Sequence, residues 1–183
     1  QFMEFWAWDQ DSLNLLSEHI ETKEVLPADL LKALLNARFF QSGMQTLRQL
    51  EFALFDLSIH RANPALNAEQ IQATLNEIRE KYAVLPTTAY NRFQHSFSHI
   101  FAGGYAAGYY SYKWAEVLAS DAFDRFENEG IFNTATGKEF RQFILAVGGK
   151  DTALDAFINF RGREPKIDAL LRHQGWTNTN KSA

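Results

Sequence analysis

Apolar residues recur at intervals of three and four along almost the whole of this 183-residue chain. That interval places side chains on one face of an α-helix, whereas a half-buried strand alternates apolar and polar residues. One such stripe consists entirely of leucine: Leu47, Leu50, Leu54 and Leu57. Because no strand-like alternation and no internal repeat accompany it, the pattern predicts an all-α fold, a packed multi-helix array.

Prolines, glycines and capping residues divide this pattern into separate helices. We expect helices over about residues 12–20, 27–42, 44–62, 68–84, 111–128, 136–148, 152–160 and 166–173, the fifth of them starting anywhere between Gly104 and Ser111. Gly43 is expected to separate the second helix from the third. The expected caps are Asp11 or Ser12, Thr136, and Asp151 or Thr152.

The composition excludes several classes of protein. Hydrophobic residues make up 46% and aromatic residues 14% of the chain, which argues against a disordered segment. A net charge of −4 gives no electrostatic reason to expect a nucleic-acid partner. No apolar run approaches the roughly 20 residues that cross a bilayer, so no membrane partner is expected. Without cysteine, disulfides and thiolate metal sites are impossible.

The segment from Phe97 to Trp114 concentrates hydrogen-bond donors beside two glycines. It contains His99, the pair Gly103-Gly104, and several tyrosines. Adjacent glycines occur where a chain bends sharply or lets another backbone come close. Imidazole and phenol groups can donate a hydrogen bond to a developing oxyanion at neutral pH. The segment is therefore predicted to be an active-site loop.

Three tyrosines of this segment would share one face if residues 105–116 were helical. Tyr105, Tyr109 and Tyr112 stand at i, i+4 and i+7, whereas Trp114 would point the other way and anchor the helix in the core. The alternative is ordinary amphipathic packing, with the rings inward and the hydroxyls at the rim.

The other polar motifs are weaker. His95 and His99 would share a helix face suited to zinc, but no glutamate follows His95 and no third ligand stands at a diagnostic spacing. A zinc site built by this chain alone stays open as an alternative. His60 and His173 are expected on helix surfaces. The turn Arg161–Pro165 is expected to pair its arginines with neighbouring acids, although it could also hold an anion.

Four separated stretches resemble the thimet oligopeptidase and oligopeptidase A family of zinc metallopeptidases. They are Gln1–Trp6, Arg48–Asp56, Phe97–Val117 and Phe160–Pro165. The resemblance extends over nearly the whole chain except its polar end. It implies a helical, zincin-like catalytic domain with a deep channel that admits short peptides.

The resemblance also implies where the zinc ligands lie. The family binds zinc through two histidines of a His-Glu-x-x-His helix and a later glutamate, all of which would precede Gln1. Residues 1–177 are then expected to be the carboxyl-terminal helical part of the catalytic domain, truncated at its amino terminus, followed by a polar tail at 178–183. Such a segment would bind no zinc of its own and would be inactive alone.

Six residues of this chain match functional positions of the family. The resemblance implies that His99 and Tyr112 are catalytic, through stabilisation of the charge that develops on the substrate carbonyl oxygen. The others would contact substrate or form the hinge of the loop: Tyr105, Tyr109, Gly103 and Gly104. No metal ligand is implied within the chain.

The expected intact protein is a cytoplasmic zinc-dependent oligopeptidase that degrades short peptides. The rest of the catalytic domain is its expected partner. A stripe of Phe2, Phe5 and Trp6 would pack on that missing part, leaving an apolar patch through which the segment alone could self-associate. The alternative is a non-catalytic helical module that binds a partner or has a structural role.

Overall fold

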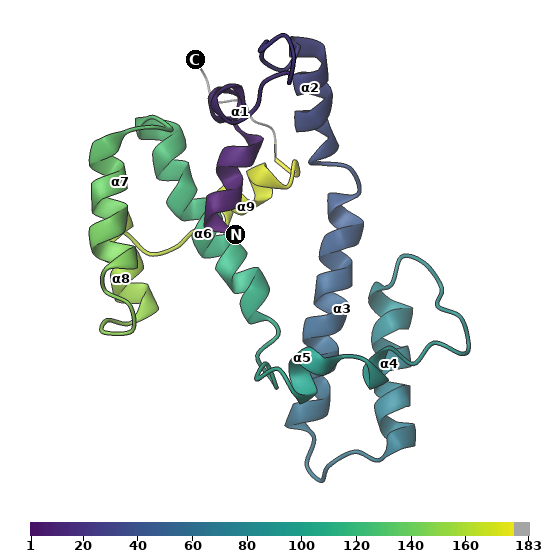
Figure 1. The fold of residues 1–183 in the computed structure, drawn as a ribbon. Coiled ribbons are helices and arrows are strands. Elements are labelled where there is room, and N and C mark those ends of the chain that lie inside the picture. The colour runs from purple at the N-terminus through teal and green to yellow at the C-terminus, as the bar shows by residue number, and fades with distance from the viewer. Residues whose placement is uncertain (178–183) are drawn as a thin grey trace. The chain divides into compact units, whose positions relative to one another are not determined.

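The computed structural model describes residues 1–177, and this part of the chain is helical with no strand, as the periodicity predicts (Figure 1). None of its helices is long and apolar enough to span a membrane. It divides into two compact units, one of Gln1–Phe40 with the chain from Ala115 onward, the other of Gln41–Trp114. The expected polar tail, 178–183, lies outside the described residues.

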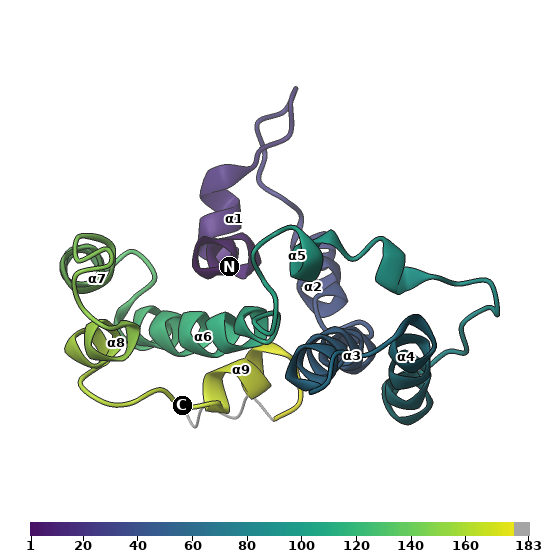
Figure 2. The ribbon, with the colours of Figure 1, turned by 90° about the horizontal axis from the view of Figure 1, so that it is seen from below.

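The second unit is built on a helical hairpin. Its elements are α3 (Ser42–Arg61), α4 (Ala68–Tyr82), the short η2 (Phe93–His95), α5 (Ser98–Phe101) and the first turn of α6 (Ser111–Glu129). Helices α3 and α4 lie side by side in both ribbon views (Figure 1 and Figure 2). The buried core draws one residue each from α3, α4, the segment before α5, and α5: Phe55, Leu75, Phe97 and Ile100.

Helix α4 follows the sequence closely. It begins after Asn67, whose side chain accepts from the Gln70 backbone while the Gln70 side chain accepts from the Asn67 backbone. This reciprocal capping box satisfies two amides that the helix itself leaves unpaired. Leu75 is completely buried, and Ile71 and Ile78 pack around it. The expected inward face is confirmed, although the helix ends two residues early, at Tyr82.

Helix α3 differs from its expected form in two ways. The preceding break is at Gln41, which has a left-handed φ of 56°, whereas Gly43 lies inside the first turn. The leucine stripe is only partly covered, with Leu50 exposed. Its buried face instead carries Phe55 and two carboxylates, Glu51 and Asp56. Periodicity missed this face because acids count as polar, yet both find partners that compensate for their burial.

The first unit has an aromatic core. Its elements are η1 (Phe2–Trp8), α1 (Gln10–Leu16), α2 (Ala28–Ala37), the remainder of α6, α7 (Thr134–Phe140), the π-helical η3 (Arg141–Leu145), α8 (Ala153–Arg161) and α9 (Asp168–His173). Four buried phenylalanines from α6 and α8 form the centre of this core: Phe123, Phe126, Phe157 and Phe160. These rings bury the large apolar areas that stabilise a unit of this size.

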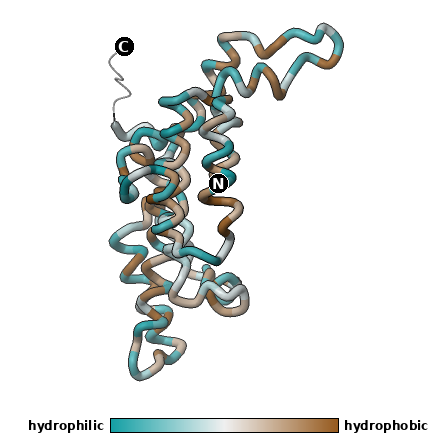
Figure 3. The backbone as a smooth tube through the Cα atoms, turned by 90° about the vertical axis from the view of Figure 1, so that its left-hand side faces the viewer, coloured by the Kyte–Doolittle hydropathy of each residue, from teal (hydrophilic) through white to brown (hydrophobic). Residues whose placement is uncertain are grey.

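The opening segment completes this core. In the tube coloured by hydropathy, hydrophobic and hydrophilic stretches alternate along the helices, as expected of helices that bury one face (Figure 3). Phe2 stacks on Phe140 with ring centroids 4.1 Å apart, and Phe5 stacks on Phe123 at 4.9 Å. The Trp6 indole N–H donates to the Ile131 carbonyl oxygen at 3.3 Å. The expected exposed patch is therefore wrong for these residues, because the same chain supplies the surface on which they pack.

Two helix starts also differ from the expected ones. Asp9 caps α1, which ends at Leu16, so Ile20 lies beyond it and is exposed. Asn133 caps α7, whereas Thr136 is buried and its hydroxyl donates to the Glu129 carboxylate at 2.5 Å. In both cases a neighbouring Asx residue accepts the first free amides. The expected cap of α8 at Thr152 is confirmed.

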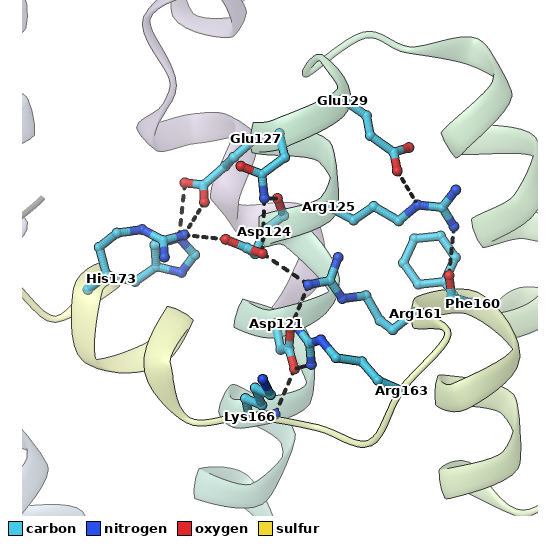
Figure 4. Close-up of polar contacts among 12 residues, drawn as sticks. Asp121, Asp124, Arg125, Glu127, Glu129, Phe160, Arg161, Arg163, Lys166 and His173 are labelled. Atoms are coloured by element: carbon cyan, nitrogen blue, oxygen red, sulfur yellow. Dashed lines mark hydrogen bonds and ion pairs between the residues drawn. The ribbon is translucent and has the colours of Figure 1, made fainter. Parts of the chain in front are cut away.

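A network of arginines and acids joins α6 to the α8–α9 turn (Figure 4). Asp121 is only 1% exposed. Both of its carboxylate oxygens accept from Arg163 at 2.6 Å, and it also accepts from Arg161 at 2.9 Å and from the Lys166 backbone at 2.7 Å. The expected pairing of the arginine turn with neighbouring acids is thus confirmed, and its role here is structural.

His173 ends α9, packs against α6 and is buried, contrary to the surface position that we expected. Its Nε2 lies 3.0 Å from Glu127, and its ring packs against Phe5 at 4.7 Å. Arg172 also pairs with Glu127. Burial raises the pKa of Glu127, but the hydrogen bond and charge of His173 and those of Arg172 outweigh it and lower this pKa to about 2.

Candidate functional site

The histidine and tyrosines singled out by the sequence come together in the second unit. His99 lies in α5, Tyr105 and Tyr109 lie in the turns that follow, and Tyr112 lies in the first turn of α6. The Tyr112 ring centroid is 5.2 Å from that of Tyr105 and 5.0 Å from that of Tyr109. His99 lies 6.3 Å from Tyr105 and 6.0 Å from Tyr109. The four rings therefore form one aromatic cluster.

The reason for this clustering is not the one that the spacing suggested. Helix α6 begins only at Ser111, so Tyr105 and Tyr109 do not share a helix face with Tyr112. Successive turns, closed by hydrogen bonds from Gly108 to Tyr105 and from Ser111 to Gly108, gather the rings instead. Trp114 is 54% exposed and does not anchor the helix in the core.

Two of the phenols are set to keep their protons. A hydrogen bond with the Tyr105 side chain, then burial, then the nearby Tyr105 and Tyr109 raise the pKa of Tyr112. Burial raises the pKa of Tyr109, and the positive charge of Arg48 opposes that effect. The Tyr109 hydroxyl donates to Gln49 Oε1 at 3.2 Å. At neutral pH both groups are therefore neutral phenols, and the single hydroxyl proton of Tyr109 is already donated to Gln49.

The glycine pair serves two separate needs. A Cβ on Gly103 would lie 2.9 Å from the His99 carbonyl oxygen, so only glycine lets the chain pass this close to α5. Gly104 has a φ of +78°, which side chains disfavour. The turn is closed by the Gly103 amide, which donates to Ser98, and the Tyr105 amide, which donates to His99. The glycines thus let the chain fold back on His99.

Sequence reasoning missed Asp56. Its completely buried carboxylate accepts from the Ala107 backbone N–H at 2.8 Å through Oδ1 and from the Tyr109 backbone N–H at 2.9 Å through Oδ2. His60 Nδ1 lies 2.8 Å from Oδ1 on the same carboxylate. His60 lies exposed on α3, as expected, but it is paired with this acid rather than isolated. The sequence signal that could have revealed this buried acid is its position between two apolar residues, Phe55 and Leu57, on a predicted helix.

The described residues do not fit a zinc site by themselves. His95 ends η2 whereas His99 lies in α5, so the two histidines do not stand one turn apart on one helix. Within residues 1–177 no group of three histidine, cysteine, aspartate or glutamate side chains is placed to hold a metal ion. The side chains gathered at this site are phenols and an imidazole, whose donor groups suit a carbonyl or an oxyanion.

Comparison with known proteins identifies the family. Residues 1–176 match the model of Peptidase family M3. The chain is 53% identical to oligopeptidase A of Haemophilus influenzae and to oligopeptidase A of Escherichia coli, over 97% and 96% of its length, and 49% identical over 96% to a probable cytosolic oligopeptidase A of Arabidopsis thaliana. It spans 26% of the length of each of these relatives. The chain therefore belongs to peptidase family M3.

Proposed function

We propose that the intact protein is a zinc-dependent oligopeptidase that hydrolyses short peptides, and that this chain supplies the hydrogen-bond donors of its active site. The observation that carries the proposal is the single cluster formed by His99, Tyr105, Tyr109 and Tyr112. Membership of a peptidase family and the relatives named oligopeptidase A support it.

Hydrolysis of a peptide bond places negative charge on the former carbonyl oxygen. The Tyr112 hydroxyl and the His99 imidazole donate hydrogen bonds to that oxygen in our proposal. Donors of this kind contribute about 2.7–4 kcal/mol each to transition-state stabilisation when they are held in position beforehand. The Tyr112 hydroxyl keeps its proton at neutral pH, as the donor role requires, because its pKa lies above the ordinary tyrosine value of 10.0, which is itself well above neutral.

The neighbouring residues bind the peptide and place it. Tyr105 and Tyr109 contact the substrate beside the scissile bond, and Gly103 and Gly104 form the hinge of the loop that carries them. A mobile donor loop admits substrate before the donors close on it. When bound, zinc polarises the carbonyl and activates the attacking water. We propose that its ligands lie outside this chain, in the rest of the catalytic domain.

This assignment makes the chain the carboxyl-terminal part of the catalytic domain, inactive without the remainder. The chain spans only 26% of the length of each oligopeptidase A relative, which supports the proposal that other parts of the protein are needed for activity. We also propose a cytoplasmic location, which the name of the probable cytosolic relative supports.

The test compares the intact protein with this chain alone. A short fluorogenic peptide is incubated with each, with and without a metal chelator and with added zinc. The intact protein is expected to cleave the peptide in a chelator-sensitive way, and the chain alone is expected to cleave nothing. Chelator-sensitive cleavage by the chain alone would contradict the proposed division of the site. An intact protein that cleaves no peptide would favour the non-catalytic module.

A further inference from the structure

We propose that Asp56 is a positioning residue, whose buried carboxylate fixes the backbone of the tyrosine turns and thereby holds the Tyr112 hydroxyl where catalysis needs it. This inference rests on the proposed function. The juxtaposition that carries it is a fully buried acid on α3 bonded to two backbone amides on either side of Gly108.

The carboxylate uses both of its oxygens on the turn. Oδ1 accepts from Ala107 at 2.8 Å and Oδ2 accepts from Tyr109 at 2.9 Å. Hydrogen bonds that involve a charged group are stronger than neutral ones. The two bonds together fix the orientation of the peptide units as well as their distance from α3. A single acceptor could not fix both.

The conformation that Asp56 holds is one that the turn would not adopt freely. Ala107 has a left-handed φ of 55°, which carries a steric cost for any residue with a Cβ. Ala107 is also exposed, so packing of its own side chain does not hold it there. The bond from its amide to Asp56 offsets that cost, because release of the amide would leave Oδ1 of the buried carboxylate with His60 Nδ1 as its one remaining partner among the described residues.

The fixed turn is connected to Tyr112 by hydrogen bonds and by rings. The Gly108 amide donates to the Tyr105 carbonyl at 2.8 Å, and the Tyr112 amide donates to the Tyr109 carbonyl at 3.2 Å. The Tyr105 and Tyr109 rings both contact the Tyr112 ring. A shift of the peptide units that donate to Asp56 therefore displaces Tyr105 and Tyr109, whose rings flank Tyr112.

The same helix provides a matched control. Glu51 is as deeply buried as Asp56, but its carboxylate pairs with Arg79 at 2.8 Å and with Arg48 at 3.2 Å. Glu51→Gln therefore changes a buried carboxylate of α3 to an amide, as Asp56→Asn does. It lowers stability through the arginines and leaves the acceptors of the turn in place.

The first experiment measures amide hydrogen exchange in the intact protein. The Ala107 and Tyr109 amides are expected to exchange slowly in the wild type, although they lie in a surface turn. Asp56→Asn is expected to accelerate both, since an amide side chain has one acceptor oxygen for two donors. Glu51→Gln should leave both rates unchanged. Wild-type exchange as fast as that of an unstructured peptide would overturn the inference, whether or not a variant folds.

The second experiment is a double-mutant cycle on peptide hydrolysis. Asp56→Asn is expected to lower kcat about 10- to 100-fold with a smaller change in KM, as for a misplaced catalytic group. In a Tyr112→Phe background it should lower kcat little further. An equal loss of kcat in both backgrounds would overturn the inference and leave the proposed function standing. If Tyr112→Phe alone left kcat unchanged, the proposed function would fail, and positioning of Tyr112 for catalysis would fail with it.

Discussion

The ring of Tyr105 stacks on the ring of Tyr112, with centroids 5.2 Å apart and planes inclined by 25°. The two side chains are also hydrogen bonded. Such a ring pair stabilises a fold by about 0.5–1.5 kcal/mol more than the burial of its apolar area does. Each ring therefore restricts the position of the other. Tyr105, which we propose contacts the substrate, thereby influences both the position and the acidity of the proposed catalytic phenol.

Removing the Tyr105 hydroxyl should make Tyr112 more acidic. The hydrogen bond with Tyr105 is the largest of the effects that raise the pKa of Tyr112, so Tyr105→Phe should lower this pKa toward the ordinary value of 10.0. The measurement is an NMR titration of ring-labelled tyrosine between about pH 8 and pH 12. An unchanged or higher pKa would contradict the observed pairing.

A side chain at position 103 should disturb the turn beside His99. Gly103→Ala places its Cβ 2.9 Å from the His99 carbonyl oxygen, a backbone atom that cannot rotate away. We expect a loss of about 1–3 kcal/mol in the free energy of unfolding and a lower kcat/KM for peptides. Urea unfolding and a peptidase assay of the intact protein measure the two effects.

Gly43→Ala is the matched control for that substitution. Its Cβ would meet nothing within 4 Å and would lie in the first turn of α3. Alanine should therefore raise the free energy of unfolding by up to about 1 kcal/mol. If both alanine variants changed the free energy of unfolding equally, the close approach to the His99 carbonyl oxygen would not explain why position 103 is a glycine.

The helical architecture was predictable because capping and periodicity are local. The inward face of α4 and the cap of α8 at Thr152 were read from neighbouring residues alone, although the expected caps of α1 and α7 were wrong. The start of α3 and the buried acids Glu51 and Asp56 could not be predicted in this way. The two acids depend on partners far along the chain: Arg79 for Glu51, and the amides of Ala107 and Tyr109 for Asp56.

The residues of the site were predicted, but the backbone conformation that brings them together was not. The resemblance selected His99, Tyr105, Tyr109 and Tyr112, and the structure brings these four together. Helical spacing gave the wrong reason, since turns rather than a helix face gather the rings. Their roles in catalysis, and the hinge at the glycine pair, stay predictions.

Breaking the buried ion pairs of Asp121 should destabilise the first unit strongly. Asp121, which is 1% exposed, is the carboxylate shared by Arg161 and Arg163. Asp121→Asn removes its charge, and among the described residues Arg161 then keeps only its pair with Asp124. Removal of one partner from a buried pair costs about 3–5 kcal/mol. Urea unfolding followed by tryptophan fluorescence reports this loss, since Trp6 lies against the same core.

Glu139→Gln is the comparison for that variant. Its carboxylate pairs with Arg125 at 2.7 Å, but the side chain is 45% exposed. Surface pairs contribute about 0–1 kcal/mol, so the loss should be much smaller. Equal losses in the two variants would contradict the structural role assigned to Asp121.

Acid should weaken the first unit through Glu127. Its pKa is lowered from 4.5 to about 2, so its contribution is fully present above about pH 4.5 and is lost as the pH falls toward 2. The contribution is up to about 3 kcal/mol for a shift of this size. Glu127→Gln should be less stable at pH 7 and should lose less stability between pH 4.5 and 2. Parallel unfolding curves for wild type and variant across that range would contradict this.

The central claim is tested most directly by the steady-state kinetics of Tyr112→Phe in the intact protein. The variant keeps the ring contacts and loses only the hydroxyl, so kcat for a short peptide should fall about 100- to 1,000-fold while KM changes little. Tyr110→Phe is the control, since Tyr110 is exposed and lies outside the four-ring cluster, and its kcat should match the wild type. A Tyr112→Phe variant with wild-type kcat would contradict the account.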